Sequence, residues 1–160
     1  MTWAEMLDDK ALNKLDWKIE SDRFGNVVMS PPPRSRHREY QGEMIGLLRQ
    51  KLKDGFAVPE CPVETSEGVK EPDAAWISRE RRSSRPNDPV YLIAPEICVE
   101  VMSPCNSKEE TTERKRLFFE KGAVEFWVCD LLGKMTFSDA GGGLPASKMC
   151  PDFPAKLQIG

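Results

Sequence analysis

The sequence lacks the patterns on which disulfide frameworks, structural zinc sites and histidine-dependent triads are built. Its five cysteines are odd in number, widely spread and include no CxxC pair, which argues against a disulfide framework and against a zinc site. The one histidine, His37, has no GxSxG or Cys-His signature beside it, so a catalytic triad lacks its usual partners. We predict a surface or helix-capping position for His37.

Long apolar runs and an excess of positive charge are missing as well. No run approaches the roughly 20 apolar residues of a membrane-spanning helix, and the first residues lack the basic and apolar regions of a secretory signal. We therefore expect no membrane partner and a cytoplasmic location. The net charge of -3 differs from the basic balance typical of strong nucleic-acid binders, which counts mildly against DNA as a tight ligand.

The remaining composition is typical of a globular protein. The 160 residues are 39% hydrophobic and 31% charged, and a chain of this length can bury a sizeable core. We predict one domain over residues 1–160, with a core spanning about residues 36–130. The glycine run at residues 141–143 precedes no predicted helix and so does not match a phosphate-binding loop.

The N-terminal part is predicted to form a helix and a β-hairpin. Thr2 followed by Glu5 is the capping-box pattern that opens a helix, and apolar residues recur at helical spacing within residues 1–15. Apolar and polar residues then alternate on both sides of residues 23–26, where glycine and asparagine supply the positive φ of a tight connection. Pro31 is expected to end this hairpin, since proline cannot continue a β-ladder.

The pattern that follows predicts a three-layer α/β arrangement. A broad apolar stripe predicts a helix over residues 36–53, and Ser107 and Gly122 mark the start and end of a second helix. The strands of the main sheet are predicted at residues 56–64, 73–78, 96–103 and 124–130. The order helix, strand, strand, strand, helix, strand predicts an α/β fold with a mixed central sheet flanked by helices.

A long segment rich in arginine, serine and proline separates the second and third predicted strands. We expect an exposed loop at residues 79–95. Its arginines form either a solvated face or a patch that contacts phosphate groups. These arginines are Arg79, Arg81, Arg82 and Arg85.

Two carboxylates stand in otherwise apolar predicted strands. Asp73 opens one strand and Glu100 lies near the end of the next, where an unpaired charge is costly to desolvate. On neighbouring strands the two carboxylates can converge on one hard cation such as Mg²⁺, which takes oxygen ligands. The alternative is structural, with Asp73 exposed at a strand end and Glu100 salt-bridged to an arginine.

The helix that follows Glu100 carries a basic pair, Arg114 and Lys115. At about 3.6 residues per turn, residues 111, 114, 115 and 118 share roughly one face, so both basic side chains can point back over the sheet. A lysine there can orient or deprotonate a water molecule, whereas an arginine can only stabilise negative charge. The alternative is a solvent-exposed pair. Glu20, which closes a predicted strand, is expected to pair with an arginine or lysine.

Six sequence blocks, collinear over nearly the whole chain, resemble the Uma-type (Uma-two) restriction endonuclease family. They are KIESDRFGNVVMSPPP, HREYQGEMIGLL, GVKEPDAAWIS, PEICVEVMSP, KRLFFEKGAVEFWVCD and CPDFPAKL. The family is a former domain of unknown function within the PD-(D/E)XK nuclease superfamily. The resemblance implies a restriction-endonuclease-like αβββαβ core, and it implies DNA as the substrate.

The resemblance also assigns site residues. Asp73 matches the acidic residue of the PD motif and Glu100 matches the glutamate before a V-x-S-P stretch, so both carry over as ligands of Mg²⁺ or Mn²⁺. Glu20 matches an early acidic residue that would be an auxiliary metal ligand. Many nucleases of the superfamily have a lysine where Met102 stands here. In Uma-type relatives the lysine comes from the following helix, at the position of Arg114.

Arg114 at the lysine position is a departure from the family pattern. Either Lys115, about 100° away on the helix, substitutes for that lysine, or catalysis is weakened or lost. We expect a Mg²⁺-dependent endodeoxyribonuclease that hydrolyses phosphodiester bonds and, by analogy with the superfamily, forms a homodimer. The alternatives are a degenerate DNA-binding or protein-interaction module and an enzyme that acts on another phosphate-containing substrate.

Overall fold

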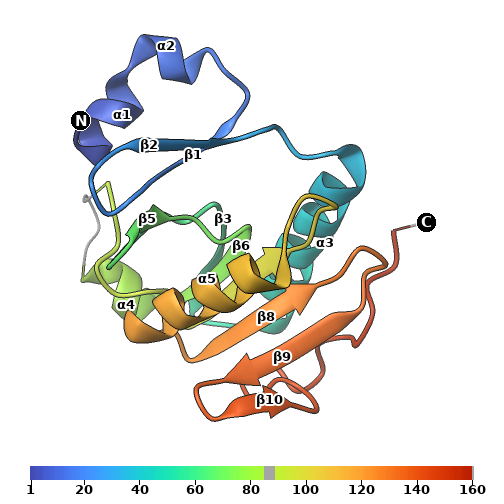
Figure 1. Ribbon diagram of the computed structural model, residues 1–160. Helices are drawn as coiled ribbons and strands as arrows, with labels where there is room; N and C mark the ends of the chain where they lie inside the picture. The colour runs from blue at the N-terminus through green and yellow to red at the C-terminus, as the bar shows by residue number, and fades with distance from the viewer. Residues whose placement is uncertain (85–88, 160) are drawn as a thin grey trace.

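The computed structural model describes residues 1–84 and 89–159. Its centre is a mixed sheet whose six strands are β3 (Gly55–Pro59), β6 (Ala74–Ser78), β7 (Ile97–Val101), β8 (Glu125–Cys129), β9 (Met135–Asp139) and β10 (Gly142–Leu144). The strand order is β10-β9-β8-β7-β6-β3 (Figure 1). β7 and β8 run parallel, and the other neighbouring pairs are antiparallel.

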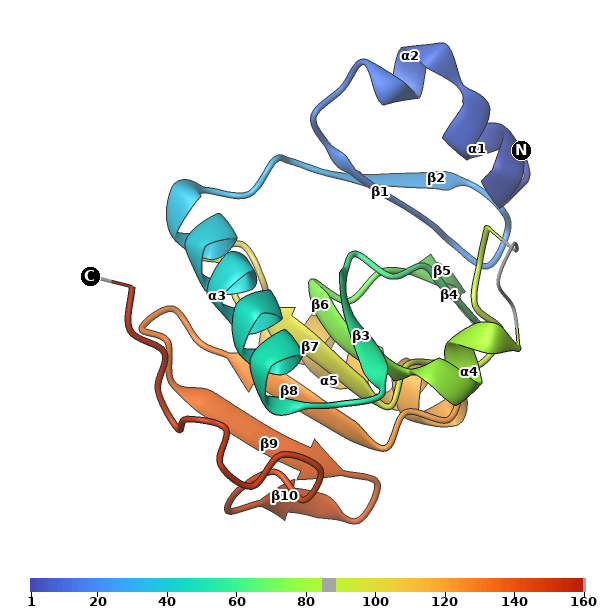
Figure 2. The same cartoon turned by 180° about the vertical axis from the view of Figure 1, so that it is seen from behind.

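Two helices cover the sheet, α3 (Ser35–Lys51) on one face and α5 (Lys108–Glu120) on the other (Figures 1 and 2). In chain order, α3, β3, β6, β7, α5 and β8 give an αβββαβ core. β9 and β10 extend the sheet on the β8 side. The predicted α/β fold with a mixed central sheet flanked by helices is confirmed.

The hydrophobic core lies on both faces of the sheet. On the α3 side, Met44 packs in one cluster with Val99 of β7. On the α5 side, Phe118 packs in a second cluster with Cys98. Because successive side chains of a strand point to opposite faces, Glu100 shares the α5 face with Cys98. The strand pattern therefore aims this carboxylate at α5.

The ends of α5 follow the predicted capping signals. The hydroxyl of Ser107 accepts a hydrogen bond of 3.1 Å from the backbone N–H of Glu110. Gly122, just past the helix, has φ +97°, a conformation that glycine adopts without steric cost. These two residues fix where α5 begins and ends, and the buried Leu117 and Phe118 mark the helix face that lies on the sheet.

The N-terminal part forms two short helices, α1 (Trp3–Asp8) and α2 (Lys10–Asn13), where the sequence predicted one. The break falls at Asp9, whose side chain caps α2. The predicted capping box of Thr2 and Glu5 is present. The predicted hairpin is also confirmed as β1 (Lys18–Ser21) and β2 (Val27–Ser30), which crosses above the sheet (Figure 1).

The predicted strand over residues 56–64 is wrong in its second half. The chain leaves β3 at Pro59, and Glu60 has φ +49°, so the ladder cannot continue in line. A separate hairpin of β4 (Val63–Thr65) and β5 (Gly68–Lys70) follows. Strand β5 of this second hairpin packs against β1.

The predicted loop over residues 79–95 contains a short helix, α4 (Arg79–Ser83). Within it, Arg81 has a structural role, because its Nη1 donates hydrogen bonds to the backbone carbonyls of Ala94 at 2.7 Å and Gly122 at 2.9 Å. Arg85 lies outside the described residues. None of the described helices is both long enough and apolar enough to cross a membrane.

Gly68 lets the β1–β2 hairpin approach β5 closely. Its φ is +95°, and a Cβ there would lie 2.3 Å from the backbone oxygen of Ser21. We expect Gly68→Ala to lower the free energy of unfolding, measured in urea, by about 2–3 kcal/mol.

Gly46 in α3 is the matched control, because a Cβ there meets nothing within 4 Å. Gly46→Ala should leave stability unchanged or raise it, since alanine is the better helix former. If Gly68→Ala were as stable as the wild type, the close approach of the hairpin would be contradicted.

Candidate active site

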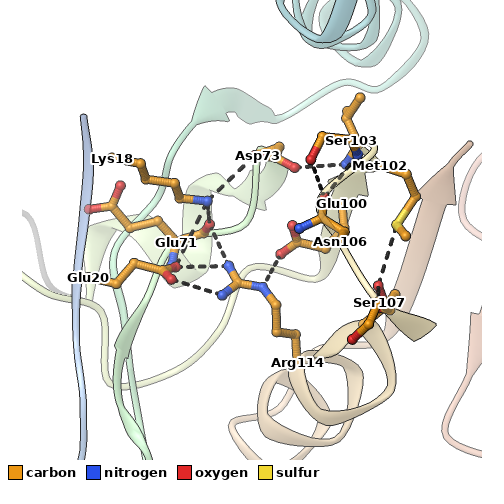
Figure 3. A network of polar contacts seen from close by, with 12 residues as sticks. Lys18, Glu20, Glu71, Asp73, Glu100, Met102, Ser103, Asn106, Ser107 and Arg114 are labelled. Atoms are coloured by element: carbon orange, nitrogen blue, oxygen red, sulfur yellow. Dashed lines mark hydrogen bonds and ion pairs between the residues drawn. The ribbon is translucent and has the colours of Figure 1, made fainter. Parts of the chain in front are cut away.

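Asp73 and Glu100 lie side by side at one end of β6 and β7. Ala74 is opposite Val99 in the antiparallel ladder, and one further step of this register places Asp73 opposite Glu100. The backbone N–H of Val101 donates a hydrogen bond of 2.8 Å to Asp73 Oδ2. Both carboxylates are buried, with 6% and 8% of their surface exposed. Two of the predicted site residues are thus together (Figure 3).

Arg114 reaches this point from α5 and joins three segments of the chain. Its Nε donates a hydrogen bond of 2.8 Å to Glu100 Oε1, and its Nη1 and Nη2 donate bonds of 3.0 and 2.8 Å to the two carboxylate oxygens of Glu20. Nη2 also donates to the backbone carbonyl of Glu71 at 2.9 Å. We call this arrangement of Arg114, Glu20, Glu100 and the Glu71 carbonyl the arginine clasp (Figure 3).

The position of Arg114 follows from the periodicity of α5. It stands one turn before the buried Phe118, and its guanidinium lies 5.7 Å from the centre of that ring. Thr111, one turn earlier, contacts the sulfur of Met102 through its hydroxyl at 3.4 Å. The helix face predicted to look back over the sheet is thus the one that carries these three side chains.

Lys115 is not joined to the clasp. It lies one position along α5 and is partly buried, and it forms no hydrogen bond or ion pair with any described residue. Its predicted role as a substitute lysine stays a prediction. Glu20, in turn, is the partner of an arginine, which the sequence reasoning favoured.

Lys18 is a site residue that the sequence reasoning missed. From β1, its Nζ donates a hydrogen bond of 2.5 Å to the backbone carbonyl of Glu71 and lies 3.5 Å from Asp73 Oδ1 and 3.9 Å from Glu20 Oε2. Its side chain is only 16% exposed. The available signal was the alternation of β1, since Lys18 and Glu20 stand two residues apart on the same strand face.

The prediction of a surface or capping position for His37 was wrong. Its side chain is 11% exposed, and its Nε2 lies 3.4 Å from Asp73 Oδ2. One turn later, Gln41 donates a hydrogen bond of 2.7 Å to the backbone carbonyl of Asp73. His37 stands seven residues before the buried Met44, so the apolar stripe of α3, extended backwards, identifies its face.

The two neighbouring carboxylates differ in their electrostatics. Burial disfavours the charged form of Asp73, but Lys18 and the hydrogen bond from His37 outweigh it and hold the Asp73 pKa below its usual range. Burial raises the pKa of Glu100, and Arg114 only partly offsets that effect while the charge of Asp73 adds to it. Asp73 is thus the firmly ionised member of the pair.

The carboxylate oxygens of the site suit a hard divalent cation that keeps several water ligands, rather than an ion that is enclosed entirely by protein ligands. Among the described residues, no three His, Cys, Asp or Glu side chains are grouped as a metal site of their own. Mg²⁺ commonly uses one or two carboxylates and completes its shell with water and phosphate. Within residues 1–84 and 89–159, Glu100 Oε2 accepts no hydrogen bond and Asp73 Oδ1 accepts only the long one of 3.5 Å from Lys18, whereas both oxygens of Glu20 accept bonds from Arg114. The fit therefore involves Asp73 and Glu100.

The arginine clasp generates a stability prediction. Arg114→Met leaves Glu20 and Glu100 buried without their cation, and we expect the free energy of unfolding in urea to fall by about 3–5 kcal/mol. Arg116→Met, two residues along α5 from Arg114 and in an exposed network with Glu113 and Glu120, should cost far less. Equal losses in the two variants would contradict the clasp.

Glu71 generates a pH prediction. Burial raises the pKa of its carboxyl from 4.5 to about 8 in the folded protein, against the pull of Lys18. Between these two values the folded state keeps a proton that the unfolded state has released, so stability falls as the pH rises through this window. In EDTA, Glu71→Gln should therefore lose less stability than the wild type between about pH 5 and pH 8. The raised pKa of Glu100 acts in the same direction and persists in the variant. An unchanged pH slope would show that Glu71 is not protonated in the folded protein.

The comparisons with known proteins show a family and a similar fold. The model of the Uma2 family, described as "Putative restriction endonuclease", matches residues 4–136. The fold is similar to the crystal structure of a "putative nuclease belonging to DUF820" from Anabaena variabilis, with a TM-score of 0.76, 17% sequence identity, and coverage of 98% of this chain and 94% of that chain. No curated protein matches the sequence. The family match spans most of the chain, and the protein therefore belongs to the Uma2 family of "putative restriction endonucleases".

Proposed function

We propose that the protein is a metal-dependent endonuclease that hydrolyses phosphodiester bonds in DNA. The observation that carries this proposal is the convergence of Asp73 and Glu100 at the same end of two adjacent strands, on the fold of a nuclease family. Two cations, Lys18 and Arg114, lie beside them. Carboxylates next to cations in one buried site suit phosphoryl chemistry, where charge must be balanced throughout.

In this proposal Asp73 and Glu100 hold Mg²⁺ or Mn²⁺. When bound, such an ion activates the attacking water and neutralises charge on the phosphate. The chain's own contribution is to fix the two carboxylates. The Val101 amide orients Asp73, and Arg114 orients Glu100 while staying protonated itself.

The start of α3 supports a phosphate-containing substrate. His37, in the first turn, contacts Asp73, so this helix end adjoins the site. Arg34, at the N-cap, makes no capping hydrogen bond with its side chain, and the first backbone N–H groups of a helix attract anions. Arg34 and Arg36 are both exposed. This region offers positive charge to a nucleic-acid backbone despite the net charge of -3.

The arginine clasp favours one competing function, a degenerate nuclease fold that binds DNA or protein without cleaving. Arg114 already neutralises Glu100, and it stands where a lysine is expected in the family. An ion pair that must be broken before a metal binds would weaken the metal site. This candidate therefore predicts DNA binding that is independent of metal.

The test is cleavage of supercoiled plasmid and of single-stranded DNA and RNA by the purified protein with Mg²⁺ or Mn²⁺. We expect metal-dependent nicking of DNA, and we expect Asp73→Asn and Glu100→Gln to lower the rate by at least about 100-fold, because each loses a charge at the reacting phosphate. Glu43→Gln, at an exposed position of α3, is the control and should cleave at the wild-type rate.

Three outcomes separate the candidates. If the wild type nicks DNA and the Asp73→Asn and Glu100→Gln variants do not, the nuclease proposal is supported. Cleavage that survives both substitutions points to a contaminating enzyme and contradicts it. DNA binding without cleavage, equal with metal and with EDTA, favours the binding module.

A further inference from the structure

We propose that Lys18 is a catalytic residue of this site, whose ammonium group donates a hydrogen bond to the reacting phosphate beside Asp73. In this proposal, β1 supplies the lysine that α5 lacks at position 114. The inference rests on the proposed nuclease function and adds to it the residue that stabilises the transition-state charge.

Arg114 is poorly placed for this role because four of its five N–H donors are used in hydrogen bonds to protein groups. Nε, Nη1 and Nη2 all donate within the clasp, to Glu100, to both oxygens of Glu20 and to the Glu71 carbonyl. A substrate that recruited Arg114 would break these bonds and leave buried carboxylates unpaired. The clasp therefore makes Arg114 a positioning residue.

Lys18 keeps donor capacity at the point where a substrate would bind. An ammonium group carries three N–H donors. Two are used, in the bond of 2.5 Å to the Glu71 carbonyl and in a longer bond of 3.5 Å to Asp73 Oδ1, while Glu20 Oε2 lies 3.9 Å away as an ion-pair partner. The amine thus lies next to the Asp73 oxygen proposed to face the metal, with one donor left for an incoming oxygen.

The backbone of β1 is fixed, so Lys18 is preorganised. Ser21 accepts a hydrogen bond of 2.8 Å on its hydroxyl from the Val69 amide and one of 2.9 Å on its carbonyl from Lys70 Nζ. Gly68 allows this contact. A donor that is held in place before the substrate arrives stabilises developing charge without reorganisation.

The competing explanation is that Lys18 only balances the charge of Asp73. Two kinds of measurement separate the explanations. A counter-ion should affect folding and metal affinity, whereas a donor to the phosphate should affect the rate of the chemical step after metal and DNA have bound.

The experiment compares the wild type, Lys18→Met and Lys18→Gln, with Lys10→Met, an exposed lysine of α2, as the matched loss of one positive charge. Single-turnover cleavage is measured at saturating Mn²⁺, Mn²⁺ affinity by calorimetry, and DNA affinity by fluorescence anisotropy with Ca²⁺ in place of Mn²⁺. Lys18→Gln retains a donor for the Glu71 carbonyl and decides the matter if Lys18→Met does not fold.

We expect cleavage by both Lys18 variants to fall by about 100-fold or more, with Mn²⁺ affinity and DNA affinity each changed by less than about five-fold. Lys10→Met should match the wild type in all three measurements.

Cleavage by the Lys18 variants within about three-fold of the wild type, in a protein that Asp73→Asn inactivates, would overturn the role of Lys18 and leave the nuclease proposal standing. A Lys18→Gln protein that loses Mn²⁺ binding would also overturn it, because Lys18 would then act through the metal site. A wild type that cleaves nothing would overturn both proposals.

Discussion

The carboxylates of Glu20, Asp73 and Glu100 are buried together where β1, β6, β7 and α5 meet. Burying that much like charge is costly unless each group gains a partner. Arg114 forms ion pairs with Glu20 and Glu100 and so links β1 to α5, while Lys18 forms an ion pair with Asp73. The placement of the N-terminal hairpin over the sheet thus depends on this charge balance as well as on apolar packing.

The same balance gives the site its chemical asymmetry. Asp73 is held ionised by Lys18 and His37, whereas burial raises the pKa of Glu100 in spite of Arg114. In our account the basic function of the site is kept despite the arginine on α5, and it is shared between two residues. Arg114 takes over the structural part, and Lys18, on a segment outside the αβββαβ core, takes over the contact with substrate.

The sequence predicted the parts of the fold that depend on local pattern. The alternation of β7 and the capped helix that follows it are sufficient to bring Glu100 and Arg114 near each other, and their contact needs no long-range information. Lys18 was missed and the prediction for His37 was wrong because the burial of these side chains depends on the docking of β1 and α3 at the end of the sheet. β1 docks through the β4–β5 hairpin, which residue periodicity did not reveal because the chain turns at Glu60 with a positive φ.

The measurement that tests the central claim most directly is anomalous diffraction from crystals soaked in Mn²⁺. The account predicts one strong anomalous peak within coordination distance, about 2.0–2.3 Å, of both the Asp73 and Glu100 carboxylates, with the Arg114 to Glu20 pair still intact and no such peak in Asp73→Asn crystals. Saturating Mn²⁺ that leaves this position empty, with Arg114 still bonded to Glu100, would contradict it.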